Sequence, residues 1–225
     1  GDTYDALLED YEPGATAVQL EAMFAEMRPR LVELRGKVLE KPAPAGLSGT
    51  FGEAEQMAFT AKLALAFGYD LSRGRIDMAT DPFNCFYSTI HEVGHACYEQ
   101  NIDAGYALTP LGGGVSMGVH ESQSRIYENQ LGRSRAFTGW MFEEMKTAFG
   151  DIGVADADAF YAAVNRVQKD FIRTESDEFQ YNLHIMLRFD LERALISGDL
   201  PVADLESAWN TRFKADFGYD VPKAS

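Results

Sequence analysis

Helical periodicity runs along nearly the whole 225-residue chain, and it constrains the fold more than any other feature. The longest example is the amphipathic run AVQLEAMFAEMRPRLVELRGKVLEK, which follows Thr16. Thr16 and Gln19 have the spacing of a capping box, which predicts that a helix begins there. Pro29 lies inside the run and is expected to kink the helix or split it in two, because proline lacks a backbone donor.

Turn-forming residues divide the rest of the chain into further helices. The segment KPAPAGLSGTFG at 41–52 is rich in Pro, Gly and Ser, which predicts a connector. Helices are then expected at about 53–67, 87–101, from 118 or 119 onward, and at about 134–149, 156–171, 174–197 and 202–216. We therefore predict a mainly α fold with at most a small β-ribbon, formed by about 75–83 and 109–117.

Charge and cysteine content exclude several classes of protein. The formal net charge is −15, and no basic patch with interleaved aromatic residues offsets it, so nucleic acid is not expected as a partner. The apolar runs are short and broken by charge, and the acidic N-terminus lacks the pattern of a signal peptide, so we expect no membrane span and no export. The two cysteines form no disulfide framework and indicate a cytoplasmic protein with reduced thiols.

Residues 91–95 read HEVGH, which is a metal-binding pattern. On a helix, positions i and i+4 lie about 40° apart around the axis after one full turn, with about 6 Å of rise. His91 and His95 therefore point the same way and can share one zinc ion, while Glu92 flanks that ion and is placed to activate a bound water. Gly94 lowers helix propensity by about 1 kcal/mol, so we expect a neighbouring element to approach closely there.

A catalytic zinc ion needs a third protein ligand and an open fourth position. Glu121, on the next predicted helix, is the candidate, because two crossing helices would bring it to the ion. His120 projects differently and is a candidate for a substrate contact or for a group that supports a ligand. Cys97 lies roughly 200° around the helix from His95 and should face away. A solvent-exposed helix face is the alternative, but the apolar neighbours of the motif argue against it.

Three long stretches of the chain match a known pattern. They read HEVGHACYEQ, TPLGGGVSMGVHESQSRIYENQLGRSRAF and AVNRVQKDFIRTESDEFQYNLHIMLRFDLERALISGDLPVADLESAWN. Together they resemble the carboxypeptidase Taq family of metallocarboxypeptidases. The resemblance implies a multi-helix, zincin-like metallopeptidase core with one divalent metal per chain, zinc or alternatively cobalt. It implies that His91, His95 and Glu121 hold the metal and that Glu92 is the general base.

The resemblance also implies an activity and partners. The reaction is release of single residues from peptides with a free C-terminus, by a cytoplasmic protein that is a homodimer in its full-length form. The chain begins inside the family pattern, without its leading N-terminal helices, and lacks a segment like DVRITTRY before the motif helix. It ends before a family motif resembling GxxQDxHW, which contributes a histidine to the substrate site. We therefore expect a fragment or truncated homologue, with 1–225 forming a single helical catalytic-core region.

A carboxypeptidase must also recognise the free carboxylate of its substrate. A guanidinium does this through a two-pronged hydrogen bond, and Arg173 in IRTESDE is the candidate. The family's IR-x-x-AD motif points to the same residue, with Ser176 in place of alanine. A salt bridge to a neighbouring acidic residue is the alternative. Asp177 is a candidate for a hydrogen bond that fixes one of the two motif histidines.

Two other interpretations stay open at this point. The first is a metal-binding module without turnover, in which the metal ligands are present but part of the substrate-binding wall is missing. The second is a different H-E-x-x-H enzyme, such as an endopeptidase or an aminopeptidase. The order of the three matching stretches favours the carboxypeptidase.

Overall fold

The structure is a computed structural model that describes residues 2–77 and 84–222. These residues form helices joined by turns and loops, and they contain no strand, which confirms the prediction of a mainly α fold. Of the segments considered for a β-ribbon, 75–77 and 109–117 contain none, and 78–83 lie outside the described residues.

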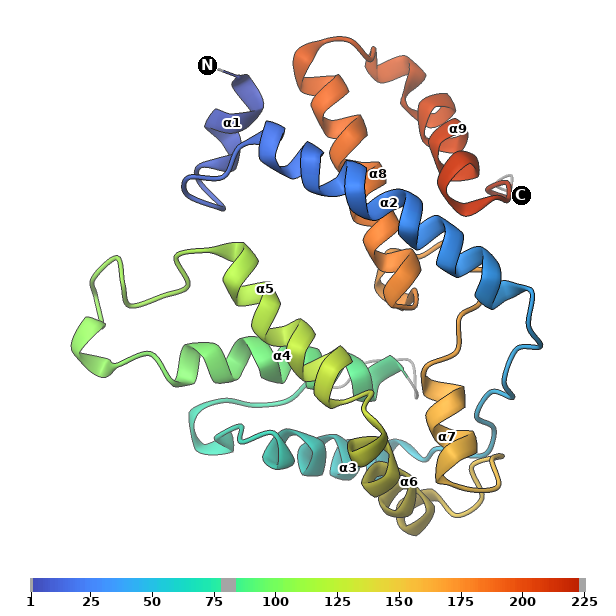
Figure 1. The fold of residues 1–225 in the computed structure, drawn as a ribbon. Coiled ribbons are helices and arrows are strands. Elements are labelled where there is room, and N and C mark those ends of the chain that lie inside the picture. Colours follow the sequence, from blue (N-terminus) through green and yellow to red (C-terminus); the bar gives the residue numbers. More distant parts are fainter. Residues whose placement is uncertain (1, 78–83, 223–225) are drawn as a thin grey trace. The chain divides into compact units, whose positions relative to one another are not determined.

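The chain folds as two compact units. Residues 1–43 and 167–225 form one, here called the terminal unit, and residues 44–166 form the other, the central unit. Figure 1 shows the order of their helices along the chain. A division into compact units does not decide whether both serve one catalytic site, so a single catalytic-core region over 1–225 stays a prediction.

Three long helices dominate the terminal unit. Its elements are α1 (Thr3–Leu8), α2 (Ala17–Leu39), η4 (Arg173–Glu175), α8 (Glu178–Ser197), η5 (Val202–Asp204) and α9 (Leu205–Phe217). The predicted capping box is present at the start of α2, where the Thr16 hydroxyl accepts from the Gln19 amide and the Gln19 side chain accepts from the Thr16 amide.

Helix α2 continues through Pro29, so the predicted split of the helix at this residue does not occur. Neighbouring residues explain this. The guanidinium of Arg28 binds Asp190 of α8 at 2.7 Å and also Asp216 of α9. Leu31 packs against the core of the same unit. Tertiary contacts on both sides of the proline therefore outweigh the lost backbone hydrogen bond.

The core of the terminal unit surrounds a buried histidine. The rings of Phe213 and Phe217 on α9 stack with centroids 4.1 Å apart, and His184 of α8 lies 4.7 Å from Phe217. His184 is fully buried, and neither ring nitrogen has a hydrogen-bond partner among the described residues. Burial, helped by the nearby Arg188, lowers the pKa of His184 to about 4, so the ring is neutral at neutral pH.

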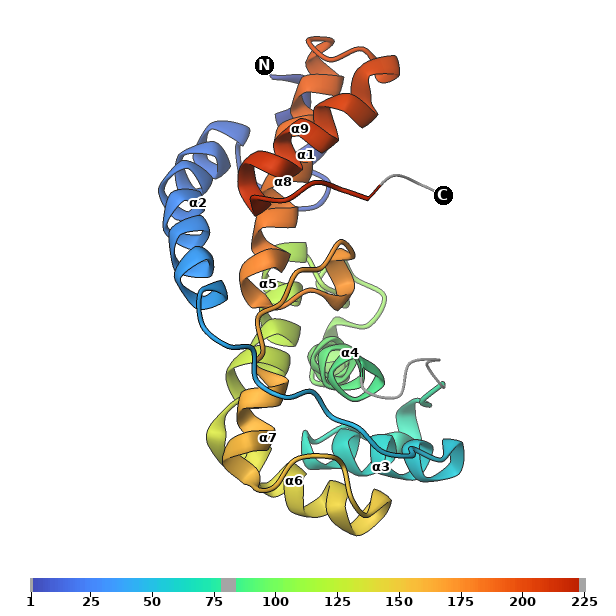
Figure 2. The same ribbon diagram turned by 90° about the vertical axis from the view of Figure 1, so that its right-hand side faces the viewer.

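The central unit carries the H-E-x-x-H motif on its long helix α4. Its elements are α3 (Glu53–Ala66), η1 (Leu71–Arg73), α4 (Asn84–Gln100), η2 (Ala104–Tyr106), α5 (Met117–Arg125), the π-helical segment η3 (Ile126–Leu131), α6 (Arg135–Phe149) and α7 (Ala157–Val164). Helix α4 packs against α3, α5 and η3 (Figures 1 and 2). Phe86 and Ile90 of α4 are fully buried with Met141 and Met145 of α6, which fixes the motif helix in the core of its unit.

Helix α7 ends at Val164, earlier than the sequence pattern predicts. The side-chain amide of Asn165 donates to the Tyr161 carbonyl at 3.0 Å and to the Arg133 carbonyl at 3.2 Å, which caps the helix. The chain then passes from the central to the terminal unit at residues 166–167 and leaves the helical path. Over the described part of the chain, no helix is both long and apolar enough to cross a membrane.

The buried His184 predicts a specific loss of stability in acid. The unfolded chain protonates this ring with the ordinary pKa of 6.5, and the folded chain does so only near 4. Above pH 6.5 the ring is neutral in both states, and the protein keeps its full free energy of unfolding. As the pH falls from 6.5 towards 4, the free energy of unfolding decreases by about 2–3 kcal/mol in total. Urea unfolding at fixed pH values should show this loss in wild type and a shallower one in His184→Leu. Parallel stability curves for the two proteins would contradict the prediction.

Candidate metal centre

Helix α4 presents two imidazoles to one carboxylate of α5. The Nε2 atoms of His91 and His95 lie 3.6 and 3.1 Å from Glu121 Oε2. One ligand atom from each of these three residues lies within 4.8 Å of the others. Two imidazole nitrogens and a carboxylate oxygen are the usual protein ligands of a catalytic zinc ion, which binds them at about 2.0–2.2 Å. The structure thus brings together the three predicted ligands, and this donor set suits a divalent metal.

A close helix crossing makes this convergence possible. A Cβ atom at Gly94 would lie 2.5 Å from Ser124 Cα and 3.0 Å from Ser124 N, both in the backbone of α5. The expected close approach at Gly94 is therefore confirmed, and α5 is the element that approaches. Ser124 is fully buried, and its hydroxyl donates to the Glu121 carbonyl at 2.9 Å. The missing side chain at Gly94 lets the turn that carries Glu121 lie against the motif helix.

The outer nitrogen of His91 has a carboxylate partner that the sequence analysis missed. His91 Nδ1 lies 3.0 Å from Glu128 Oε2, in the π-helical segment η3. Arg125 donates to Glu121 Oε1 at 3.0 Å and to Glu128 Oε2 at 2.9 Å, so it links both acids. Such a carboxylate fixes the tautomer and orientation of a ligating histidine. The signal in the sequence is the spacing, because positions 121 and 128 differ by seven residues, or about two helical turns.

The electrostatics of the centre favour the protonation states that metal ligands need. Burial, followed by the charge of His91, lowers the pKa of His95, which keeps its ring neutral. Burial raises the pKa of Glu121, but His91 and Arg125 outweigh it and leave the pKa below its ordinary value. Burial also raises the pKa of Glu128, and there the hydrogen bond with His91 and the charge of Arg125 again prevail. Both acids are therefore ionised at neutral pH.

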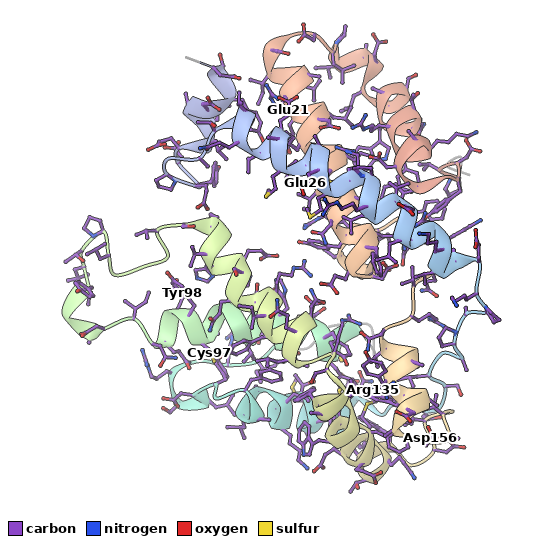
Figure 3. The ribbon with its side chains drawn as sticks, viewed as in Figure 1. Glu21, Glu26, Cys97, Tyr98, Arg135 and Asp156 are labelled. Atoms are coloured by element: carbon purple, nitrogen blue, oxygen red, sulfur yellow. The ribbon has the colours of Figure 1, made fainter. Side chains whose placement is uncertain are left out.

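His120 contacts the candidate ligand His95. Its Nδ1 lies 2.6 Å from His95 Nδ1, and its Nε2 lies 2.8 Å from Glu99 Oε1. Its ring packs on Tyr98 with centroids 4.5 Å apart. Cys97, next to Tyr98 in Figure 3, is buried with its thiol directed to the Phe67 carbonyl, and it is not among the grouped ligands, as the helix geometry predicts.

The candidate general base, Glu92, is exposed on α4. It forms no ion pair with any described residue, and its negative charge offsets a small part of the lowering of the His95 pKa. Its carboxylate thus lies near His95 and is in no salt bridge within the described residues.

The remaining predicted site residues lie in the terminal unit. Arg173 donates to the Tyr181 hydroxyl at 2.6 Å, and its guanidinium lies over that ring at 5.1 Å. No ion pair of Arg173 is seen within the described residues, so the alternative of a local salt bridge is not what the structure shows. Asp177 caps α8 by accepting from the amides of Phe179 and Gln180 at 3.0 and 3.1 Å. Roles for Arg173 and Asp177 at the metal centre stay predictions.

The helix crossing predicts opposite effects for two glycine substitutions. Gly94→Ala should destabilise the protein by about 1–3 kcal/mol and weaken zinc binding, because the added methyl group meets the α5 backbone. Gly139→Ala in α6 is the matched control, since it meets nothing within 4 Å and should stabilise by about 0.5–1 kcal/mol. Urea unfolding and zinc titration measure both effects. Equal stability and equal zinc affinity of the two variants would show that the crossing is not tight.

Comparison with known proteins identifies the family. The sequence model of the carboxypeptidase Taq (M32) metallopeptidases matches residues 1–88 and 79–225, two segments that overlap at 79–88, which include the start of the motif helix. Thermostable carboxypeptidase 1 of Thermus thermophilus is 38% identical over an alignment of 242 positions, and the match covers 97% of this chain and 48% of that protein. Carboxypeptidase 1 of Bacillus subtilis is 35% identical over an alignment of 243 positions, and the match covers 96% of this chain and 48% of that protein.

Solved structures agree with the sequence matches. The crystal structure of the M32 carboxypeptidase from Deinococcus radiodurans R1 has a TM-score of 0.91 at 39% identity, covering 99% of this chain and 50% of that one. Metallocarboxypeptidase 1 of Trypanosoma cruzi has a TM-score of 0.91 at 31% identity, covering 97% and 51%. The chain spans about half the length of the curated relatives that it matches. It belongs to the carboxypeptidase Taq (M32) family of metallopeptidases.

Proposed function

We propose that this chain carries the metal centre of a carboxypeptidase that removes single residues from the free C-termini of peptides. The observation that carries the proposal is the convergence of His91, His95 and Glu121 in a member of a metallocarboxypeptidase family. Zinc is the proposed ion, because two imidazoles and one carboxylate form a common catalytic zinc site, and cobalt is the alternative.

The residues around the centre suit a hydrolysis by activated water. When bound, the ion would polarise the scissile carbonyl and lower the pKa of a water molecule. Glu92 is the proposed general base, which takes the proton of that water and passes it to the leaving amine. The exposure of Glu92 and its lack of an ion pair among the described residues support this role. Glu128 and Arg125 hold His91 and Glu121 in place.

Arg173 is the proposed anchor for the substrate carboxylate. Its guanidinium is held by the ring and hydroxyl of Tyr181 and has no ion pair among the described residues. Arg188 lies near enough that its pKa is lowered, first by burial and then by the charge of Arg173. Two neighbouring guanidiniums in a chain of net charge −15 form a local positive region suited to a carboxylate.

The other parts of the proposal rest on the sequence and on the family resemblance. They are a substrate contact or a supporting role for His120, a supporting role for Asp177, a homodimer in the full-length form and a cytoplasmic location. Peptides with a free C-terminus are the proposed substrates, and nucleic acid and membranes are not proposed as partners.

A metal-binding module without turnover is the second candidate function. It requires only the grouped ligands His91, His95 and Glu121, which all lie within the central unit. Metal analysis combined with hydrolysis of N-blocked peptides separates the possibilities. Bound zinc with release of only the C-terminal residue supports the carboxypeptidase, and bound zinc without turnover supports the module. Internal cleavage would instead indicate an endopeptidase, and absence of stoichiometric metal would overturn both metal-based proposals.

The role of Glu92 predicts that binding and catalysis separate in one variant. In any active form that contains this chain, Glu92→Gln should keep zinc affinity but lose hydrolysis by at least about 100-fold, because an amide keeps the shape but cannot accept the proton. Glu143→Gln, an exposed position of α6, removes the same charge elsewhere and should leave activity unchanged. Zinc titration and single-turnover kinetics provide the two readouts. Substantial turnover in Glu92→Gln would show that another group is the base.

The role of Arg173 predicts a loss of preference for free-acid substrates. Arg173→Ala should lower kcat/KM for peptides with a free C-terminus about ten- to a hundredfold, or about 1.5–3 kcal/mol, because a charge-assisted hydrogen bond is lost. C-terminally amidated peptides should be affected much less, and Arg173→Lys should rescue poorly, because lysine lacks the planar fork.

Arg30→Ala is the matched control for the loss of an arginine from the terminal unit, since the Arg30 side chain is 76% exposed and, among the described residues, forms an ion pair only with Glu26. It should leave the ratio of free-acid to amidated turnover unchanged. If Arg173→Ala also leaves that ratio unchanged, Arg173 serves the structure of its unit and the carboxylate anchor lies elsewhere.

A further inference from the structure

The two motif histidines differ in what lies behind them. The outer nitrogen of His91 meets the carboxylate of Glu128 directly, at 3.0 Å. The outer nitrogen of His95 meets another imidazole, that of His120, at 2.6 Å. The far nitrogen of that second ring lies 2.8 Å from Glu99 Oε1. His95, His120 and Glu99 thus form a continuous row of three side chains that ends in an exposed carboxylate.

Only one arrangement of protons satisfies this row when His95 binds a metal through Nε2. A neutral imidazole carries a single N–H group, so the proton of His95 must then be on Nδ1. His95 Nδ1 is therefore the donor, and His120 Nδ1 is the acceptor. The proton of His120 must in turn lie on Nε2, from which it is donated to Glu99 Oε1. The proton position on each ring thus fixes that on the next. The Glu99 carboxylate can only accept, so both hydrogen bonds are donated towards it.

The surrounding backbone holds the end of this row in place. Glu99 Oε1 also accepts from the Gly114 amide at 3.2 Å, which ties the carboxylate to the glycine-rich loop between α4 and α5. A Cβ atom at Gly114 would collide with Cδ2 of the His120 ring, so a glycine is needed for the ring to lie there. The Tyr98 ring packs on the imidazole of His120. The ring is therefore held by a carboxylate, an aromatic face and a loop.

We propose that Glu99, acting through His120, is a positioning residue that fixes the tautomer and orientation of His95 as a metal ligand. The inference rests on the proposed function, since it presupposes metal binding by His91, His95 and Glu121. It assigns Glu99 the part for His95 that Glu128 has for His91. It also makes His120 the group that accepts the hydrogen bond of the metal ligand His95.

The competing explanation is a structural staple. In that case Glu99 and His120 only tie the end of α4 to the loop, and the direction of the hydrogen bonds has no effect on the metal. The two explanations differ in what they require of position 120. The positioning role needs an acceptor facing His95 Nδ1, and the staple needs only a side chain that fills the space.

Substitutions at position 120 separate these requirements. His120→Leu fills space without an acceptor, whereas the amide oxygen introduced by His120→Asn can stand in for Nδ1 and accept from His95. Glu99→Gln keeps an acceptor for the far nitrogen of His120 but removes the negative charge. Glu143→Gln in α6 is the matched control for loss of one carboxylate from the central unit.

Zinc affinity of the 225-residue chain is measured by competition with a chromophoric chelator, and thermal unfolding of the metal-free proteins controls for folding. His120→Leu should weaken zinc binding about 10- to 100-fold, the range for loss of a group behind a metal ligand. His120→Asn should recover most of this loss, Glu99→Gln should lose several-fold at most, and Glu143→Gln nothing.

Nitrogen NMR of protein labelled in its four histidines gives a second readout, independent of activity. With zinc bound, His95 should be protonated on Nδ1 and His120 on Nε2. Protonation of His120 on Nδ1, unchanged zinc affinity in His120→Leu, or equal losses in His120→Leu and His120→Asn would overturn the positioning role alone. A wild-type chain that binds no zinc would overturn the proposed metal site, and the positioning role with it.

Discussion

The contact between Gly94 and the backbone of Ser124 is the constraint on which the metal centre depends. Two imidazoles on one helix face supply only half of a catalytic zinc site, and the third ligand must come from another element. Helix α5 can supply Glu121 only if its backbone approaches α4 more closely than any side chain at position 94 allows. Gly94 thus weakens the motif helix by itself but permits the tertiary arrangement of the centre.

The strongly acidic chain makes ionised carboxylates at the centre costly unless cations lie beside them. Arg125 bonds both Glu121 and Glu128, and Arg133 Nη2 lies 3.5 Å from Glu128 Oε1. His91 and Arg125 hold the pKa of Glu121 below its ordinary value despite burial. The hydrogen bond with His91 and the charges of Arg125 and Arg133 do the same for the pKa of Glu128. Because arginine stays charged at all accessible pH values, the acids keep their charge before a metal arrives. The centre is therefore arranged for a cation in advance.

Local spacing predicted the parts of this site that lie within one helix. The shared face of His91 and His95 follows from helix geometry, as does the orientation of Cys97 away from His95. Glu128 and Glu99 were missed because their roles depend on tertiary structure: one lies in a π-helical segment, the other meets a loop across space. The same distinction explains the fold. The helix start predicted from the capping box at Thr16 is confirmed. The course of α2 through Pro29 and the early end of α7 depend instead on contacts with other elements.

The candidate metal ligands and the candidate carboxylate anchor belong to different folded units. All three candidate ligands and the groups behind the two histidines lie between positions 91 and 128, inside the central unit. The candidate carboxylate anchor, Arg173, belongs to the terminal unit, which is assembled from two distant parts of the sequence. Metal binding therefore depends on contacts that are local in the chain and form within one folded unit. Recognition of a peptide end, if Arg173 provides it, requires the second unit as well, so the two properties can be lost independently.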